Sequence, residues 1–346
     1  MSHSPQPAHP ADPVRPAPGD QRLTRFLPED EDPALLPPEL ERLVHGLAGA
    51  PPGSGAVGEL LSGRDDTDSA SVLRWATNHT LASSTRVLPP VLDDPYDWGC
   101  VAAAHAFSPV YATGGRPVLA VNLLGWPRAL PADQAAQLLQ GGLDVARDAG
   151  CQLGGTHPLG DDRPAYGLSV TGAGRPDAVL GTDAGVAGMP LTLTKPLGSG
   201  VLTRRHRATG EYFPQAVASM TALNHRAAEE ALANGARGAV EVGDYGLLGH
   251  AYLLARASGV TVVLDSAALP FLDGARTSPA HADCPRARRV LGWLGQHLVA
   301  DGLPEEDALL LADPQISGGL LVAGEVPGFP VVGELLPRGE EAVAIR

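Results

Sequence analysis

The stretch from Asp93 to Pro127 constrains the fold more than any other part of the sequence. A run of small residues with a helical pattern, 101–107, leads into Gly114 and Gly115, and an apolar run over 118–124 follows them. Glycine commonly ends a helix, and a short apolar run bounded by Gly and Pro is typical of a buried strand. The stretch therefore predicts a helix packed against a sheet.

The rest of the chain alternates helical and extended patterns without the two-residue regularity of a sandwich, which predicts an α/β or α+β fold. Its 346 residues, 44% of them hydrophobic, exceed one typical core, so we expect domains at 22–175 and 176–346. Residues 1–21 are poor in large apolar groups and are expected to form a disordered arm. Helices are expected at 35–47, 95–108, 131–148, 213–234, 247–257 and 285–300, and strands at 70–75, 80–87, 117–124, 164–172, the start of 190–203 and 259–265.

Charge and cysteine usage exclude several classes of protein. The formal net charge of -14 repels nucleic acid and anionic membranes, so neither is an expected partner. Cys100, Cys151 and Cys284 are too widely spaced for a zinc site and are expected to be buried thiols in a reducing cytoplasm. No 18-residue apolar run or signal-peptide order is present, which also predicts a cytoplasmic protein. Lys195 is the only lysine, so a mechanism that needs two lysines is excluded.

Several short phrases occur in a fixed order along the chain. They are RLTRF (22–26), LGWP (124–127), GLSVTG (167–172), LTKPLGSGVLT (193–203), GLLGH (246–250) and DPQISGGLL (313–321), followed by GELLPRG. The ordered set resembles the selenophosphate synthetases, or selenide, water dikinases, of the superfamily that includes aminoimidazole ribonucleotide synthase. The resemblance implies a two-domain synthetase-like fold, with an N-terminal mixed sheet that dimerises and a C-terminal α/β sandwich. It also implies a homodimer that pairs strands near 80–87 and 117–124 with their mates, and it leaves open a heteromer with an active paralogue.

The resemblance also implies a chemistry whose parts are missing from this chain. Family members hold ATP through Mg²⁺ bound to several aspartates, and a mobile glycine-rich segment near the N-terminus carries a Cys or selenocysteine and an essential Lys. Ungapped counting places Asp32 at the nucleophile and Leu35 at the lysine. The sequence has no Gly, Cys or Lys between Arg22 and Arg42, and acidic residues there would repel phosphate. The catalytic residues are therefore unknown.

The family's metal-binding aspartates are also largely replaced. The first of these aspartates corresponds to Ser69, in the phrase that begins at Asp68. If the chain carries an insertion, it corresponds instead to Asp65 or Asp66. The second corresponds to Arg86 and the third to Pro109. The fourth corresponds to Glu241, with Asp244 as an additional carboxylate, so Glu241 and Asp66 are the metal-ligand candidates.

Arg86 has two interpretations. Its guanidinium could occupy the vacated metal site and bind phosphate through two parallel hydrogen bonds. Alternatively, it neutralises Asp93, Asp94 or Glu241.

The other polar candidates have weaker signals. His157 lies where the family has a turn, His105 lies on the expected helix 95–108, and Asn224 is expected inside the helix 213–234. A lone histidine is more often structural than catalytic. The glycine-rich turn within 193–203 and the SGG phrase at 317–319 are assigned by resemblance to the scaffold around the nucleotide, and close backbone packing without a ligand is the alternative.

Three functions follow from these observations. The chain is a selenophosphate synthetase-like protein of selenium metabolism that keeps the scaffold for a small-molecule ligand and has lost or reduced the reaction of ATP, selenide and water. The alternative is a functional ATP-dependent dikinase or related phosphotransferase with a rebuilt site, which would still need ATP and Mg²⁺. A third possibility is a changed chemistry that uses Arg86, His157 and Glu241 on another phosphorylated ligand.

Overall fold

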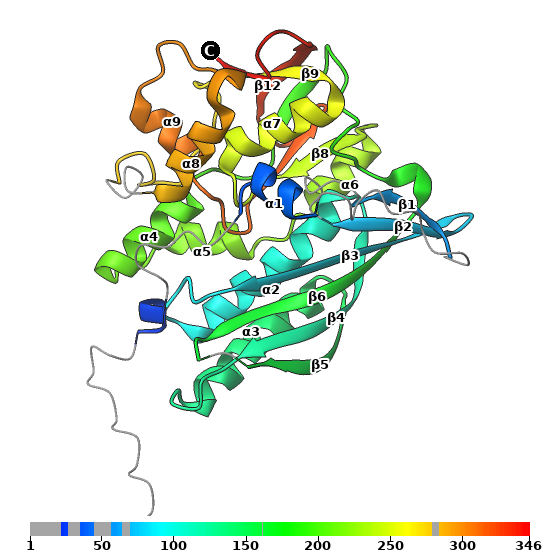
Figure 1. Cartoon of the computed structure of the whole chain (residues 1–346). Coiled ribbons are helices and arrows are strands. Elements are labelled where there is room, and N and C mark those ends of the chain that lie inside the picture. Colours follow the sequence, from blue (N-terminus) through cyan, green and yellow to red (C-terminus); the bar gives the residue numbers. More distant parts are fainter. Residues whose placement is uncertain (1–21, 27–34, 45–56, 64–69, 161, 279–283) are drawn as a thin grey trace, which may run out of the picture.

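The computed structural model describes residues 22–26, 35–44, 57–63, 70–160, 162–278 and 284–346. It contains two mixed sheets, the first below the second in Figure 1, and each is built from one half of the chain. The expected disordered arm, 1–21, lies outside the described residues. Over the described ranges, no helix combines the length and the apolar character needed to cross a bilayer.

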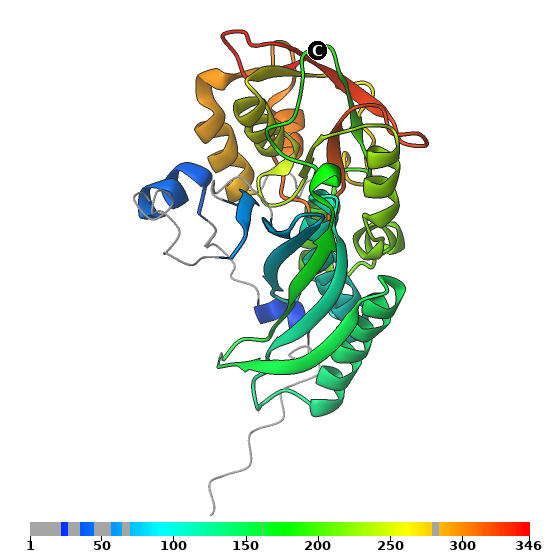
Figure 2. The same cartoon turned by 90° about the vertical axis from the view of Figure 1, so that its right-hand side faces the viewer.

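The first sheet has six strands in the order β1-β2-β3-β6-β4-β5, and only β4 and β5 run parallel. Alternating residues of its strands face the helices, as in Ala82 and Ser84 of β3, and the residues between them face outward. Figure 2 shows α3 against one face of this sheet. The strands are β1 (Glu59–Ser62), β2 (Ser71–Ala76), β3 (His79–Leu88), β4 (Arg116–Gly125), β5 (Gln152–Leu159) and β6 (Ala165–Gly174), and the helices on that face are α2 (Pro95–Ala112) and α3 (Ala132–Asp148).

Helix α2 begins and ends as its sequence predicts, but it passes through a proline. The Asp94 side chain accepts a hydrogen bond from the Asp97 N–H, and Pro95 occupies the first turn. Gly114, with φ of 79°, reverses the chain after the helix. The expected end at residue 108 is wrong because buried packing on both sides of Pro109 holds the last turn in place despite its missing N–H.

The second sheet has seven strands in the order β10-β13-β9-β12-β7-β11-β8 and is covered on both faces. Leu320 and Val322 of β11 pack in the same core as α2, whereas Leu321 and Ala323 pack in a second core with α7. The strands are β7 (Pro190–Leu193), β8 (Gly238–Glu241), β9 (Val260–Leu264), β10 (Leu298–Val299), β11 (Leu320–Ala323), β12 (Val331–Pro337) and β13 (Val343–Ile345).

Two helices expected in the second half are shorter in the structure than the sequence predicts. The expected helix 213–234 is two helices, because the chain turns between them at 222–224, and the expected helix 285–300 ends at Leu294. Strand β5 was expected to be a turn around His157, yet it pairs with β4 over its whole length. The remaining helices are α1 (Pro37–Val44), α4 (Ser199–Thr209), α5 (Pro214–Thr221), α6 (His225–Ala233), α7 (Gly246–Ser258), α8 (Pro285–Leu294) and α9 (Glu305–Leu311).

The order of the first sheet corrects the expected mode of dimerisation. Both β3 and β4 have a neighbouring strand on each side, so neither offers a free edge for pairing with a second chain. The outer face does expose large apolar side chains, with Trp75 49%, Val87 41% and Leu119 46% exposed. Two copies therefore cannot pair at the edges of β3 and β4.

Helices α2 and α3 approach each other closely at glycines. A Cβ atom built on Gly99 would lie 2.1 Å from the Leu138 carbonyl oxygen, and one built on Gly141 would lie 2.3 Å from the Tyr96 carbonyl oxygen. Real Cβ atoms do not approach backbone oxygen this closely, so any side chain at either position would push the helices apart.

We expect the substitution Gly99→Ala to lower the free energy of unfolding by about 1–3 kcal/mol, although alanine favours helix by about 1 kcal/mol. Urea unfolding measures the change. The matched control is Gly292→Ala in α8, where nothing lies within 4 Å of the added Cβ. The control should raise stability by about 0.5–1 kcal/mol. Equal effects of the two substitutions would contradict the proposed helix contact.

Candidate functional site

Arg86 faces two carboxylates where β3 ends beside the second sheet. It lies on the inner face of β3 because it follows Ala82 and Ser84 at two-residue spacing. Its guanidinium nitrogens lie 3.8 Å from Glu241 Oε2 and 3.9 Å from Asp244 Oδ2. We call the group formed by Arg86, His105, Glu241, Asp244, His250 and Arg286 the Arg86 cluster.

Glu241 is the most deeply buried acidic residue of the cluster. It ends β8 on the same face as Ala239, which packs in the core with α2, and its side chain is 2% exposed. Within the described ranges, Glu241 Oε1 has no hydrogen-bond partner. A buried polar atom without a partner is costly and often indicates a missing ligand or water.

Asp244 lies between two arginines. Arg286 Nη1 is 3.3 Å from Asp244 Oδ1, and Arg86 approaches the other carboxylate oxygen. Burial alone would raise the pKa of Asp244, but the neighbouring basic side chains outweigh it and lower that pKa. Asp244 is therefore an anion at neutral pH, and the two arginines balance the charges of the two carboxylates.

Both histidines of the cluster are buried and uncharged at neutral pH. Burial lowers the pKa of His250 to about 4, and burial also lowers the pKa of His105. His250 Nε2 accepts a hydrogen bond from the Tyr245 N–H at 3.4 Å, which leaves the proton on Nδ1. His105 Nδ1 accepts from the Ser317 N–H at 3.3 Å, so His105 links α2 to the segment after α9.

Lys195 holds the same segment from the opposite side. Its Nζ donates to the Ala222 carbonyl oxygen at 2.6 Å and to the Ser317 carbonyl oxygen at 2.8 Å. Burial lowers the pKa of Lys195 to about 7, and the charge of Glu241 opposes that shift. Ser317 has a positive φ of 48°, a conformation that costs free energy in a non-glycine residue and is held here by these contacts.

Asn224 has a structural role. It precedes α6 and is 2% exposed, so the expectation of a residue inside one long helix is wrong. Its Nδ2 donates to Ser108 Oγ at 2.8 Å and to the Gly318 carbonyl oxygen at 2.9 Å. These bonds join α2 of the first half to the SGG phrase of the second.

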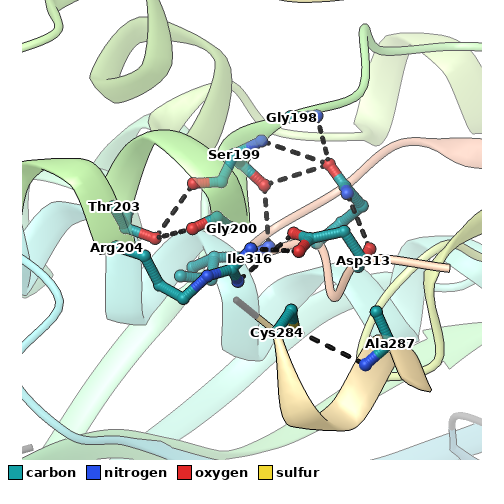
Figure 3. Close-up of polar contacts among 10 residues, drawn as sticks. Gly198, Ser199, Gly200, Thr203, Arg204, Cys284, Ala287, Asp313 and Ile316 are labelled. Carbon is teal, nitrogen blue, oxygen red and sulfur yellow. Dashed lines mark hydrogen bonds and ion pairs between the residues drawn. The ribbon is translucent and has the colours of Figure 1, made fainter. Parts of the chain in front are cut away.

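The glycine-rich turn before α4 is closed by protein atoms. Gln315 Oε1 accepts hydrogen bonds from the N–H groups of Gly198 at 2.8 Å and Ser199 at 3.2 Å, as Figure 3 shows. A Cβ atom at Gly200 would lie 2.1 Å from the Pro314 carbonyl oxygen, and one at Gly318 would lie 2.0 Å from the Val242 carbonyl oxygen. Both glycine phrases therefore make close backbone contacts, which is what the alternative of backbone packing predicts.

A second ion pair stabilises this region. Asp313 is fully buried and pairs with Arg204 of α4, whose side chain points toward it in Figure 3. Cys284 lies nearby, and burial together with the charge of Asp313 raises its pKa to about 11. All three cysteines are free and buried, as the sequence predicts.

The structure separates His157 from the Arg86 cluster. His157 is exposed on the edge strand β5, three strand positions from β3, which corresponds to roughly 14 Å at the usual strand spacing. Asp93 and Asp94 are also engaged elsewhere: Asp93 pairs with Arg22 at 2.6 Å, and Asp94 caps α2. Of the three expected acidic partners of Arg86, only Glu241 faces it.

Comparison with known proteins identifies the family. Residues 67–174 match the model "AIR synthase related protein, N-terminal domain". The chain is 39% identical over 271 residues to the selenide, water dikinase of Burkholderia orbicola (strain MC0-3), covering 77% of each chain. It is 42% identical over 262 residues to that of Porphyromonas gingivalis (strain ATCC 33277), covering 74% of this chain and 75% of the relative. The chain belongs to the selenide, water dikinase family.

Solved structures confirm the expected fold of this dikinase homologue. A structure of AaThiL complexed with AMPPCP and TMP superposes with a TM-score of 0.61 at 18% identity, covering 81% of this chain and 87% of the other. An identity this low shows the fold alone. The aminoimidazole ribonucleotide synthase-like fold that the ordered phrases imply is therefore confirmed.

Several expected positions of the family site lie outside the described residues. These are Asp32, Asp65, Asp66, Asp68 and Ser69. Leu35, at the expected lysine position, is described: its side chain is 41% exposed and its carbonyl oxygen accepts from Tyr245 Oη at 3.1 Å. The residue at that position thus lies beside the Arg86 cluster but carries no functional group.

The described part of the dikinase homologue does not fit a divalent metal ion. Among those residues, no group of three or more His, Cys, Asp and Glu side chains could hold one. Glu241 and Asp244 approach each other around the Arg86 guanidinium, and a metal ion there would be repelled by it. Pro109, buried within α2, offers no ligand atom in its side chain.

Sequence reasoning missed two members of the cluster and the role of a third residue. His250 belongs to the GLLGH phrase, which was used only as a family marker. Arg286 has no sequence signal, because its approach to Asp244 depends on how α8 packs beside α7. Lys195 was noted only as the single lysine, although its place in the TKPLGSG phrase could have suggested a buried role.

We expect the contribution of Lys195 to the free energy of unfolding to increase as the pH rises above 7. The pKa is about 7 in the folded protein against the ordinary lysine pKa of 10.5, so between these values the unfolded chain binds the extra proton and the free energy of unfolding increases with pH. Urea unfolding at pH 7, 8 and 9 should show the difference between the native protein and Lys195→Met grow by up to about 1.4 kcal/mol per pH unit. A difference that stays constant would contradict the buried amine.

Proposed function

We propose that this chain is a divergent selenide, water dikinase homologue of selenium metabolism that keeps its ligand-binding scaffold. In this proposal the conversion of ATP, selenide and water into selenophosphate, AMP and phosphate is lost or much reduced. The main observation that supports this proposal is the position of the Arg86 guanidinium between Glu241 and Asp244, where the family resemblance implies a metal-binding carboxylate.

Electrostatics support the loss of that reaction. Phosphoryl transfer depends mainly on positioning and on neutralising the charge of the transferred group, for which the family relies on Mg²⁺. A guanidinium cannot hold a metal ion, and no cysteine precedes Cys100. Because these parts of a site act together, the loss of one of them already removes most of the rate enhancement.

A functional enzyme with a rebuilt site is the second candidate, and a separate observation favours it. Glu241 is a buried acidic residue, and burying such a group destabilises a fold unless it is paired or used. Glu241 keeps one oxygen without a partner among the described residues. A scaffold with no ligand would be expected to replace this residue with an apolar one. His157 is too distant to take part within one chain, so the chemistry based on Arg86, His157 and Glu241 is not proposed.

Anaerobic incubation with ATP, Mg²⁺ and selenide tests the proposal. We expect AMP formation, measured by chromatography, to be at least about 10³-fold slower than for the Burkholderia orbicola relative assayed alongside, because its electrostatic catalysis would be absent. AMP released with selenide at a rate on the order of 1 s⁻¹ or more would instead establish the rebuilt enzyme.

We also propose a homodimer that buries the outer face of the first sheet. Support comes from the exposed Trp75, Val87 and Leu119, because exposed apolar patches on a sheet often mark an interface. A heteromer with an active paralogue would use the same face. The cytoplasmic location remains a prediction from composition.

The substitution Leu119→Arg should convert the dimer into a monomer, because it places a charge in an apolar contact. Light scattering after size-exclusion chromatography measures the mass. The matched control is Val331→Arg, which changes a residue of similar exposure, 42%, at the start of β12 in the second sheet. A native protein that is monomeric at micromolar concentration, or a Leu119→Arg protein that stays dimeric, would exclude this interface.

A further inference from the structure

We propose that the Arg86 cluster binds a phosphate group without a divalent metal ion, because the Arg86 guanidinium supplies the positive charge. The ligand is a phosphorylated small molecule that also carries hydroxyl or amine groups. The proposal rests on the retained ligand site of the proposed function. It does not depend on whether the dikinase reaction has been lost.

The hydrogen-bonding capacity of Arg86 is unused. Its contacts to Glu241 and Asp244, at 3.8 and 3.9 Å, are longer than hydrogen bonds, which reach about 3.2 Å. Over the described ranges no hydrogen bond is donated by this side chain. A guanidinium presents five N–H groups in a planar fork that matches two oxygens of a phosphate. Arg86 is thus held in place by charge and remains able to form such a pair.

The two side chains of the Arg86–Glu241 pair differ in exposure. The Glu241 side chain is 2% exposed, whereas the Arg86 side chain is 31% exposed. The buried Glu241 carboxylate therefore anchors the guanidinium at one nitrogen, the more exposed Asp244 faces the other, and the exposed part of the Arg86 side chain is open to a ligand. An arginine fixed in this way loses little side-chain entropy when it binds an anion, which favours affinity.

The charges of the cluster explain why no metal ion is needed. A site with carboxylates alone would repel phosphate unless a cation intervened. Here Arg86 and Arg286 balance Glu241 and Asp244, and His105 and His250 are uncharged. The cluster is close to neutral before any ligand binds, so a phosphate can approach the exposed guanidinium without a bridging ion.

Buried atoms around the cluster indicate the rest of the ligand. Within the described part of the chain, three of them have no hydrogen-bond partner: Glu241 Oε1, His250 Nδ1 and Ser317 Oγ. Glu241 Oε1 can only accept, His250 Nδ1 donates in the tautomer set by Tyr245, and a serine hydroxyl does both. Hydroxyl or amine groups beside the phosphate would satisfy these atoms.

Titration calorimetry tests the proposal with two probes, inorganic pyrophosphate and ATP, each in EDTA and in Mg²⁺. At least one probe should bind in EDTA, and Arg86→Gln should weaken that binding by at least about 10-fold, the usual effect of losing one charged hydrogen-bonded pair. Arg86→Lys should weaken it less, because lysine keeps the charge but not the planar fork. Arg147→Gln, an exposed arginine of α3, is the matched control and should bind as the native protein does.

The outcomes separate this inference from the proposed function. Binding of ATP but not pyrophosphate in EDTA, weakened by Arg86→Gln, supports the site and adds the nucleoside to its ligand. Three results would overturn the inference. They are binding that requires Mg²⁺, no binding of either probe, and an unchanged affinity of the Arg86→Gln protein when its thermal midpoint is native. If the Arg86→Gln protein fails to fold, the Arg86→Lys protein tests the inference instead. An affinity of that protein in EDTA equal to the native affinity would overturn the proposed bidentate pair. None of these results depends on AMP formation.

Discussion

The burial of α2 between the two sheets is the constraint on which the rest of the structure depends. One face of the helix packs on β3 and β6, and the opposite side packs in the same core as α5 and β11. Its alanine-rich sequence and Gly99 allow this close approach from several directions, because small side chains let backbones come near. That packing positions the polar links from α2 to the SGG phrase, one from His105 directly and one from Ser108 through Asn224.

A buried helix of this kind also limits what polar residues can do. Groups that face it from the second sheet, such as Glu241 and Lys195, are removed from water and must find partners within the protein or in a ligand. Lys195 finds two carbonyl oxygens, and Asn224 bridges a hydroxyl and a carbonyl. Glu241 finds only a distant guanidinium within the described ranges. The difference between satisfied and unsatisfied groups separates the scaffold from the candidate ligand site.

In the proposed function, the backbone scaffold of the family has changed less than the charged residues of its site. The glycine phrases at 198–200 and 317–319 are retained because their backbone contacts leave no room for a Cβ atom, whatever ligand is bound. The charged positions are under no such steric limit, since a carboxylate and a guanidinium both fit at the end of a strand. The proposed function, in which Arg86 replaces an acidic residue of the family, is therefore compatible with an undisturbed fold.

Sequence patterns predicted most elements to within a few residues where the local signal was strong, as for α3 and β3. They failed where tertiary contacts decided the outcome: α2 continues through Pro109 because it is packed on both sides, and β5 forms because β4 offers it an edge. That no cysteine precedes Cys100 and that Lys195 is the only lysine was evident from residue types alone. The partner of Arg86 was not, because Asp93, Asp94 and Glu241 were equally plausible by sequence.

By itself the sequence determined the family and the mixed α/β fold, since these depend on residue identity and order. Only the tertiary structure decided that Glu241 and Asp244 face Arg86, that His157 does not, and that β3 and β4 have no free edge. The physical reason is that strand order and helix packing bring together residues far apart in the chain, as with Arg86 and Glu241, which are 155 positions apart (241 minus 86), and no local pattern records those distances.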